Sequence, residues 1–369
     1  MKHLKAATVL ATTIGLVGLP SVASADATAG RGGPPVATVA SGLSGPRQVN
    51  DYIGDRLVVA ESDSGEISSV DLHTGAVKTL LSGLFGPQGV AYSDGLLYVA
   101  VGGPPPPEEG PQPPPGAKTA VLAIAKPGGP VLKTIDLLAY ELKHNPDGQV
   151  QFVDGQAVDA LSNPYSVLAQ DKRVLVADAG ANDVLAIDKH SGRISTFFVP
   201  PTVKQSEDPL CTAQAQANPG TKGCDPVPTG VVQGPDGLLY VSTLGALTPG
   251  ASRVYVLTQS GRVVRVIDDL DGATSVEVDK NGAVYVTELL AGAPEGPPPA
   301  NFDPSTIGQI VRIDKHGHRT YAQVTTPSSV EIEDGQLYST ANSVALDPSM
   351  PADGQLVRVG PKAFTPAKG

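Results

Sequence analysis

Six imperfect copies of one short phrase recur along this chain of 369 residues. Each copy is an apolar run, a polar turn and a second apolar run, as in PQGVAYSDGLLYVAV at residues 87–101. The other copies span residues 46–61, 164–178, 228–243, 273–288 and 327–341. Alternating apolar and polar residues around a turn that contains Gly or Asp predict a β-hairpin. We therefore expect six related hairpins.

A third and a fourth strand follow most of these hairpins. NDVLAID at residues 182–188 is one such third strand, and a Gly-centred turn then leads to a run that contains Thr and Val. Four strands per repeat, at a spacing of roughly 40–50 residues once insertions are set aside, are typical of a β-propeller. Only residues 137–143 have a helical pattern. We predict an all-β fold, a six-bladed β-propeller with four-stranded antiparallel blades.

The two ends of the repeat array complement each other. The last repeat ends after its third strand at Val359, and VATVASGL at residues 36–43 precedes the first repeat as an unpaired strand. Pairing these segments would close the ring and leave neither end with an exposed edge. The expected organisation is a signal peptide at 1–25, a flexible N-terminal segment at 26–35, the propeller at 36–360 and a frayed tail at 361–369. Proline runs at 104–107, 113–115 and 297–299 lie inside repeats, so we interpret them as stiff loops and not as linkers between domains.

The N-terminus has the three parts of a secretory signal. Lys2 and Lys5 precede an apolar run at residues 6–19, and small residues follow at 23–25. The apolar run is shorter than the roughly 20 residues that a membrane-spanning helix needs. We expect cleavage after Ala25 and a secreted, extracellular monomer without a membrane span; an uncleaved anchor is the alternative.

Charge and cysteine content narrow the classes of partner. The net charge is −11 and tryptophan is absent, which disfavours nucleic acid as a partner. Cys211 and Cys224 are the only cysteines. Two nearby cysteines in an exported chain are expected to form a disulfide, which stabilises such a loop by roughly 3 kcal/mol. Residues 207–225 contain no histidine, which argues against metal ligation by these cysteines.

Two segments at the third repeat carry a family resemblance. LLAYELKHNPDG at residues 137–148 and SNPYSVLAQDKRVLVADAGANDVLAID at 162–188 resemble the ScyD/ScyE family, and the likeness continues through 228–244 and 250–257. It covers nearly the whole chain after the signal segment. The resemblance implies a secreted six-bladed propeller related to the NHL and SMP-30 types, and it supplies no established reaction.

The large insertions are predicted to share one face of the ring. In propellers of this kind the first strand of each blade lines the central channel, and it starts on the face that carries the connections between second and third strands. The insertions on this loop-bearing face are residues 102–118, 140–163, 200–227, 244–252 and 289–306. Loops on a rigid scaffold commonly carry function, so we expect binding here.

Three acids end the second strands of alternate repeats: Glu61, Asp178 and Glu288. In one interpretation they surround the channel mouth and hold a hard cation through oxygen ligands. In the other, which we favour, each caps backbone amides of its own loop.

Polar residues occupy the starts of the six innermost strands. They are Arg47, Gln48, Gln88, Tyr165, Thr229, Thr274, Ser275, Ser328 and Ser329. Lactonases of this fold bind calcium with acids near these positions. This chain has no acid at these positions, so the inner strands do not support a calcium site. We identify no cofactor or metal site. The side chains either hydrogen-bond a neutral or anionic ligand, with Arg47 as the fixed positive charge, or line a hydrated channel.

The segment that leads into the third repeat contributes further candidates. His144 lies close in sequence to Asn145 and Asp147, and Asn163 and Tyr165 complete the group. His144 is a weak candidate for a general base; the alternative is that it orders its own loop.

Two classes of function follow. The first is a non-catalytic binding module that captures a small molecule, glycan or protein on the loop-bearing face. The alternative is a hydrolase or lyase of the SMP-30/gluconolactonase kind that acts at the channel mouth.

Overall fold

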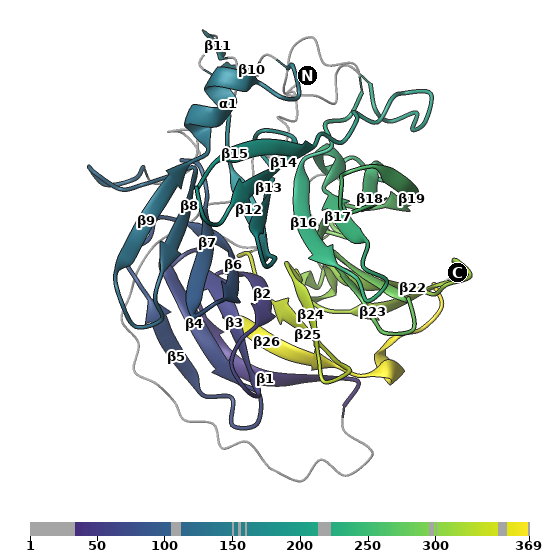
Figure 1. Ribbon diagram of the computed structural model, residues 1–369. Coiled ribbons are helices and arrows are strands. Elements are labelled where there is room, and N and C mark those ends of the chain that lie inside the picture. Colours follow the sequence, from purple (N-terminus) through teal and green to yellow (C-terminus); the bar gives the residue numbers. More distant parts are fainter. Residues whose placement is uncertain are drawn as a thin grey trace.

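The fold is a ring of six four-stranded antiparallel sheets (Figure 1). A computed structural model describes residues 34–104, 112–149, 151–153, 156–158, 161–212, 223–294, 299, 301–345 and 353–367, with only the backbone for 151–153 and 156–158. This architecture confirms the predicted six-bladed β-propeller. The predicted signal peptide lies outside the described residues.

The first five blades are consecutive in the chain, each ordered from the innermost to the outermost strand. Blade 1 contains β2 (Pro46–Asp51), β3 (Arg56–Glu61), β4 (Glu66–Asp71) and β5 (Val77–Leu81). Blade 2 contains β6 (Pro87–Ser93), β7 (Leu96–Val101), β8 (Val121–Ala125) and β9 (Val131–Asp136). Blade 3 contains β12 (Pro164–Ala169), β13 (Arg173–Asp178), β14 (Asp183–Asp188) and β15 (Ile194–Phe198). Blade 4 contains β16 (Pro228–Gln233), β17 (Leu239–Thr243), β18 (Ser252–Leu257) and β19 (Val263–Leu270), and blade 5 contains β20 (Ala273–Val278), β21 (Val284–Glu288), β22 (Gln309–Ile313) and β23 (Arg319–Gln323).

Blade 6 joins the two ends of the chain. It contains β24 (Val330–Glu333), β25 (Gln336–Ala341) and β26 (Gly354–Val359), and its outer strand is β1 (Val36–Leu43). The antiparallel pairing of β1 with β26 runs from Val36 opposite Val359 to Leu43 opposite Gly354. The predicted closure of the ring by the N-terminal strand is therefore confirmed.

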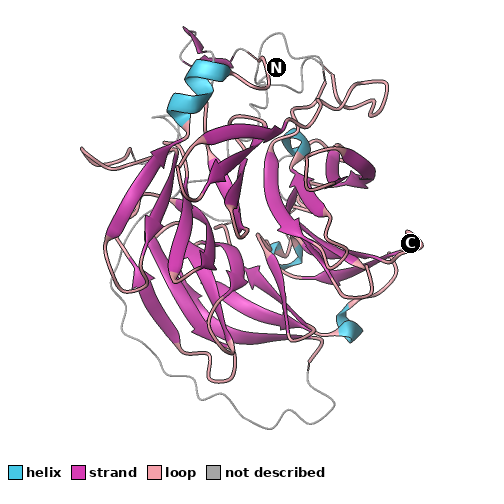
Figure 2. Ribbon diagram, in the orientation of Figure 1, coloured by secondary structure: helices cyan, strands magenta, loops and turns pink. Residues whose placement is uncertain are grey.

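Little regular structure lies outside the blades (Figure 2). The predicted helix is present as α1 (Leu138–His144), between blades 2 and 3. A small separate hairpin follows it, β10 (Gln151–Val153) with β11 (Gln156–Val158). Three short 3-10 helices complete the described elements: η1 (Gly245–Leu247), η2 (Pro304–Thr306) and η3 (Pro361–Ala363). In the part of the chain that the structure describes, no helix has the length and apolar character to cross a bilayer.

The core consists of apolar layers between neighbouring blades. Val58 of blade 1 packs in one cluster with Val90 and Leu97 of blade 2, and each other pair of neighbouring blades shares a comparable cluster. The cluster between blades 6 and 1 includes Leu43 of β1 and Leu356 of β26. Because each blade buries its apolar faces against two others, the ring must close for every face to be covered.

The described part of the tail, residues 361–367, is held against blade 5, which corrects the predicted fraying of this part. Thr365 forms two backbone hydrogen bonds with Tyr321 of blade 5, at 2.8 and 3.0 Å, and the Phe364 ring packs edge-on against Tyr285, with 5.7 Å between centroids. Phe364 and the free edge of the outer strand β23 hold this segment, and that edge belongs to blade 5, so the sequence of the tail does not indicate it.

The strand register gives the propeller one loop-bearing face. In blade 3, Pro164 at the start of β12 lies opposite Asp178 at the end of β13, which lies opposite Asp183 at the start of β14. The connection between second and third strands and the connection between blades therefore meet at the same end of each sheet, as predicted.

Leu43→Ala tests the closure. Leu43 is 1% exposed within the cluster that joins the chain ends, so we expect a loss of about 2–5 kcal/mol in the free energy of unfolding, measured by urea denaturation. Val77→Ala, at a side chain 43% exposed on an outer strand, should change it by less than about 0.5 kcal/mol. Equal effects of the two changes would contradict the closure as a source of stability.

Candidate functional site

A hydrogen bond between opposite blades spans the mouth of the central channel. The Tyr165 hydroxyl, on β12 of blade 3, lies 2.9 Å from Ser328 Oγ, which leads into β24 of blade 6. Both side chains are buried. Blades 3 and 6 face each other across the ring, so these two predicted ligand-binding residues meet near its axis.

Gln48 bonds the innermost strands of three blades together. Its Oε1 accepts hydrogen bonds from Val90 N at 3.0 Å and Val167 N at 2.9 Å, and its Nε2 donates to Val167 O at 3.1 Å. Gly89 permits this approach, because a Cβ there would lie 2.7 Å from Gln48 Oε1 and 2.6 Å from the Tyr165 carbonyl. The Gln48 side-chain amide thus provides hydrogen bonds between the innermost strands of blades 1, 2 and 3, which belong to different sheets.

Most of the other predicted channel residues are also engaged. The Arg47 guanidinium, 3% exposed, donates to the Ser343 carbonyl and lies 4.0 Å from Asp63. Gln88 Nε2 donates to Ser62 Oγ at 3.2 Å.

The predicted hydroxyl residues on blades 4 to 6 bond to backbone or to one another. Thr229 Oγ1 donates to Ala273 O at 2.8 Å, and Thr274 Oγ1 lies 2.8 Å from Thr287 Oγ1. Ser329 Oγ accepts a hydrogen bond from Val49 N at 3.2 Å and lies 3.4 Å from Ser275 Oγ. These hydroxyls already have partners within the protein, and their role in binding stays a prediction.

The three acids at the ends of second strands bond to the connections that lead into their own blades. Glu61 Oε2 accepts from Ser44 N at 2.8 Å, and Glu288 Oε1 accepts from Asp271 N at 2.8 Å. Asp178 accepts from Asn163 N at 2.6 Å, and also from two amides of the loop that follows it. Burial raises the pKa of all three carboxyls, of Asp178 to about 6 and of Glu288 to about 7, against the lowering effect of these hydrogen bonds.

The structure does not bring these three acids together. Each lies on a different blade, and among the described residues no three His, Cys, Asp or Glu side chains form a group arranged to hold a metal ion.

Of the predicted site residues that lead into blade 3, His144 is exposed, whereas Asp147 and Asn163 hydrogen-bond to neighbouring loops. His144 is exposed and stacks on Tyr140, with 4.4 Å between ring centroids. Asp147 Oδ2 accepts from Asn182 Nδ2 at 3.1 Å, and Asn163 Oδ1 accepts from Gly103 N at 3.0 Å. His144 ends α1, which contacts the outer strand of blade 3 through Tyr140, whereas Tyr165 lies on the innermost strand, and the role of His144 as a base stays a prediction.

The opposite end of the channel holds carboxylates that sequence reasoning missed. Glu277 on β20 and Glu331 on β24 interact electrostatically with each other and with Asp51 at the end of β2. Burial raises the pKa of Glu277 to about 7, and raises that of Glu331 well above its ordinary value. The sequence contains a pattern that indicates this cluster. The fifth position of the repeat is apolar in blades 2 to 4 but polar in the other three, where it is Asn50, Glu277 and Glu331.

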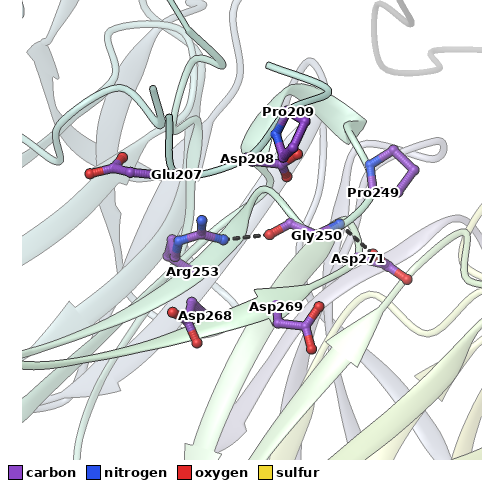
Figure 3. A pocket seen from close by; sticks show the side chains of 9 residues that line it. All are labelled: Glu207, Asp208, Pro209, Pro249, Gly250, Arg253, Asp268, Asp269 and Asp271. Atoms are coloured by element: carbon purple, nitrogen blue, oxygen red, sulfur yellow. Dashed lines mark hydrogen bonds between the residues drawn. The ribbon is translucent and has the colours of Figure 1, made fainter. Parts of the chain in front are cut away.

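An acidic hollow of about 510 Å³ opens on the loop-bearing face at blade 4 (Figure 3). Its lining residues are Glu207, Asp208, Pro209, Pro249, Gly250, Arg253, Asp268, Asp269 and Asp271. They come from the connection before β16, from the connection between β17 and β18 together with the start of β18, and from the end of β19 with the residue that follows it. Arg319 of blade 5 donates to the backbone beside the rim and lies 3.5 Å from Asp269 Oδ2, so it offsets part of the negative charge.

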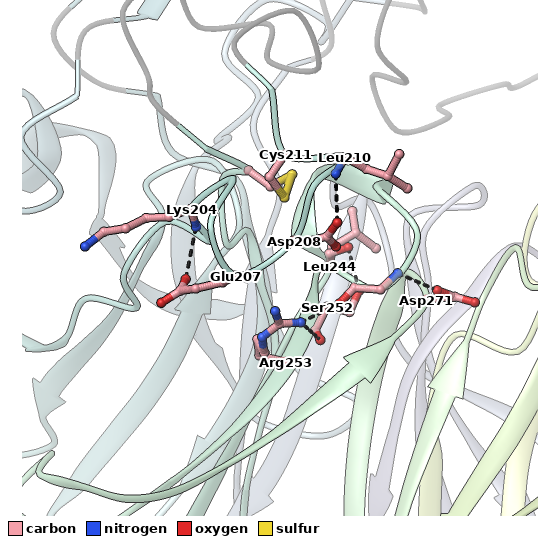
Figure 4. Close-up of a disulfide and its surroundings, with 11 residues drawn as sticks. Lys204, Glu207, Asp208, Leu210, Cys211, Leu244, Ser252, Arg253 and Asp271 are labelled. Atoms are coloured by element: carbon pink, nitrogen blue, oxygen red, sulfur yellow. Dashed lines mark hydrogen bonds between the residues drawn. A yellow bond between two sulfur atoms is a disulfide. The ribbon is translucent and has the colours of Figure 1, made fainter.

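A disulfide joins Cys211 to Cys224 beside this hollow, as predicted (Figure 4). Both sulfur-bearing residues are buried and pack with Val203 and Ala251. Val203 also pairs with Cys224 through two backbone hydrogen bonds, at 2.8 and 3.0 Å. Through its packing on Ala251, the disulfide holds the connection that carries Glu207 and Asp208 against the loop that leads into β18.

Comparisons with known proteins support the fold. No protein family model matches the chain, and no curated protein matches it. A gluconolactonase from Xanthomonas campestris aligns with 89% of this chain and 89% of its own, at 11% identity and a TM-score of 0.52. Regucalcin, a calcium-binding protein from Agrobacterium tumefaciens, aligns with 91% and 94%, at 12% identity and a TM-score of 0.50.

A virginiamycin B lyase from Staphylococcus aureus also aligns, with 87% of this chain and 96% of its own, at 12% identity and a TM-score of 0.46. Identities this low show likeness of fold alone. The resemblance to the ScyD/ScyE family stays a prediction from its sequence phrases.

Gln48→Ala should destabilise the ring. The change leaves two buried backbone amides, Val90 N and Val167 N, without their acceptor, so we expect a loss of about 2 kcal/mol or more in the free energy of unfolding. Urea denaturation measures it, with the exposed Gln336→Ala on β25 as control. No difference between the two variants would refute the structural role.

The acids at the far end of the channel predict a pH dependence. Because the folded-state pKa values of Glu277 and Glu331 are raised, their contribution to stability is fully present below pH about 4.5 and is lost as pH rises through about 7. Thermal unfolding between pH 4.5 and 8 should therefore show a falling melting temperature. The double variant Glu277→Gln/Glu331→Gln should fall less steeply; an unchanged slope would contradict the assignment.

Proposed function

We propose that this chain is a secreted, non-catalytic binding propeller that takes a positively charged ligand in the acidic hollow of blade 4. The observation that carries the proposal is the lining of the hollow, five carboxylates to one arginine. A volume of about 510 Å³ suits a small molecule. The disulfide supports an extracellular location, since such bonds persist in oxidising compartments.

The lining is held in place before a ligand arrives. Asp271 Oδ1 accepts from Gly250 N at 2.7 Å, and Asp208 Oδ1 accepts from Leu210 N at 2.9 Å. The Arg253 guanidinium donates to the Gly250 and Ser252 carbonyls, so its charge faces its own loop. Groups that are already ordered lose little conformational entropy on binding, which favours affinity.

The chemistry of the hollow selects ammonium or guanidinium groups. Glu207, Asp268, Asp269 and Asp271 are exposed, and their oxygens can accept charge-assisted hydrogen bonds. A flexible polyamine, whose several ammonium groups are separated by methylene chains, matches a site with several carboxylates. We therefore name an aliphatic polyamine as the ligand class.

A hydrolase or lyase at the channel mouth is the alternative, and the gluconolactonase neighbour makes it compatible with the fold. The hydrogen bonds of Tyr165 and Gln48 favour the binding function, because they occupy the place where a substrate would enter. Turnover of glucono-δ-lactone by the purified protein, lost in His144→Ala, would overturn the non-catalytic proposal.

Isothermal titration with spermidine tests the binding function. We expect binding to wild-type protein, weakened at least tenfold by Asp268→Asn/Asp269→Asn and by raising the salt concentration, because the attraction is electrostatic. The control Asp171→Asn/Asp334→Asn removes the same charge from exposed turns on the opposite face. Equal weakening by the two pairs would mean that net charge, and not the hollow, attracts the ligand.

A further inference from the structure

Helix α1 buries a carboxyl group against blade 3. Glu141 is 1% exposed and is the buried residue of this short helix. Asp136 caps the helix by accepting a hydrogen bond from Ala139 N at 2.8 Å. The Tyr140 hydroxyl accepts from Thr196 N at 2.9 Å, on the outer strand of the blade. The helix is thus fixed with Glu141 facing inward.

A second buried carboxyl faces Glu141. Asp183, at the start of β14, has no exposed surface, and the two carboxyl groups lie within hydrogen-bonding reach of each other. Among the described residues, neither oxygen of Asp183 has a hydrogen-bond donor, and Glu141 Oε1 has none. Buried carboxylate oxygens without donors are costly unless a cation or a proton occupies the space between them.

The described residues around the pair add further negative charge. Asp178 and Asp147 act electrostatically on Glu141 and Asp183, and both raise their affinity for protons. The oxygens of Asp178 are already committed to Ser162 Oγ, at 2.5 Å, and to backbone amides. Among the described residues, the groups that act on the pair include no lysine or arginine.

We propose that Glu141 and Asp183 bind one divalent cation, with Ca²⁺ preferred, and that the ion fastens α1 to blade 3. Carboxylate oxygens are the ligands that Ca²⁺ prefers, and its variable coordination accepts two carboxylates completed by neutral oxygens and water. A site with two carboxylates is compatible with the finding that no three acids, cysteines or histidines among the described residues form a metal-binding group. The site lies outside the ring of innermost strands and is separate from the hollow of blade 4.

Calcium titration of the EDTA-treated full chain tests the proposal. Ca²⁺ at about 100 times its dissociation constant should raise the melting temperature of wild-type protein by about 5 °C. Glu141→Gln and Asp183→Asn should each abolish the shift, whereas Asp171→Asn, an exposed acid on the same blade, should retain it. Elemental analysis of dialysed protein should find one calcium per wild-type chain and none in the two site variants.

Two results would contradict a Ca²⁺ site at Glu141 and Asp183. If neither Ca²⁺ nor Mg²⁺ shifts the melting temperature of wild-type protein, and elemental analysis finds no bound metal, the pair shares a proton and the proposal is wrong. The proposal is also wrong if Ca²⁺ binds but stabilises Asp183→Asn as much as wild type. Either result leaves spermidine binding in the hollow unaffected.

Discussion

The pairing of β1 with β26 is the contact on which the rest of this structure depends. A propeller blade has two apolar faces, and each must be covered by a neighbour. With blade 6 completed from both ends of the chain, the layer between blades 6 and 1 resembles the other five. Opening that pair would expose two strand edges and the cluster around Leu43 at once.

A closed ring brings six strand starts close to one axis, and this chain fills that space with hydrogen bonds. Gln48 joins three blades, and Tyr165 reaches the opposite blade. Such a network stabilises when every member is satisfied and is costly when one is lost. The polar side chains at the starts of the innermost strands therefore link blades to one another. The hollow that can take a ligand lies farther out, among the loops of blade 4.

Buried carboxyl groups recur outside the hollow of blade 4, in three different electrostatic settings. Glu61, Asp178 and Glu288 are stabilised by amide donors and hold the connections between blades. Glu277 and Glu331 accumulate at the far end of the channel, where burial raises their pKa. Both oxygens of Asp183 and Oε1 of Glu141 lack donors among the described residues, and there we propose a bound cation. Buried acids thus hold the connections between blades where amides donate to them, and carry uncompensated charge where no donor is present among the described residues.

Local pattern determined much of this protein from sequence alone. The hairpin phrases, the unpaired strand at residues 36–43 and the two cysteines predicted the blades, the closure and the disulfide, because each depends on neighbours in the chain or on a single available partner. Only the tertiary structure decided which polar groups meet. Gln48 and Val167 are 119 residues apart, and Glu141 meets Asp183 because a helix folds back onto the next blade. Contacts at such separations are set by how the blades pack, which no local pattern of residues specifies.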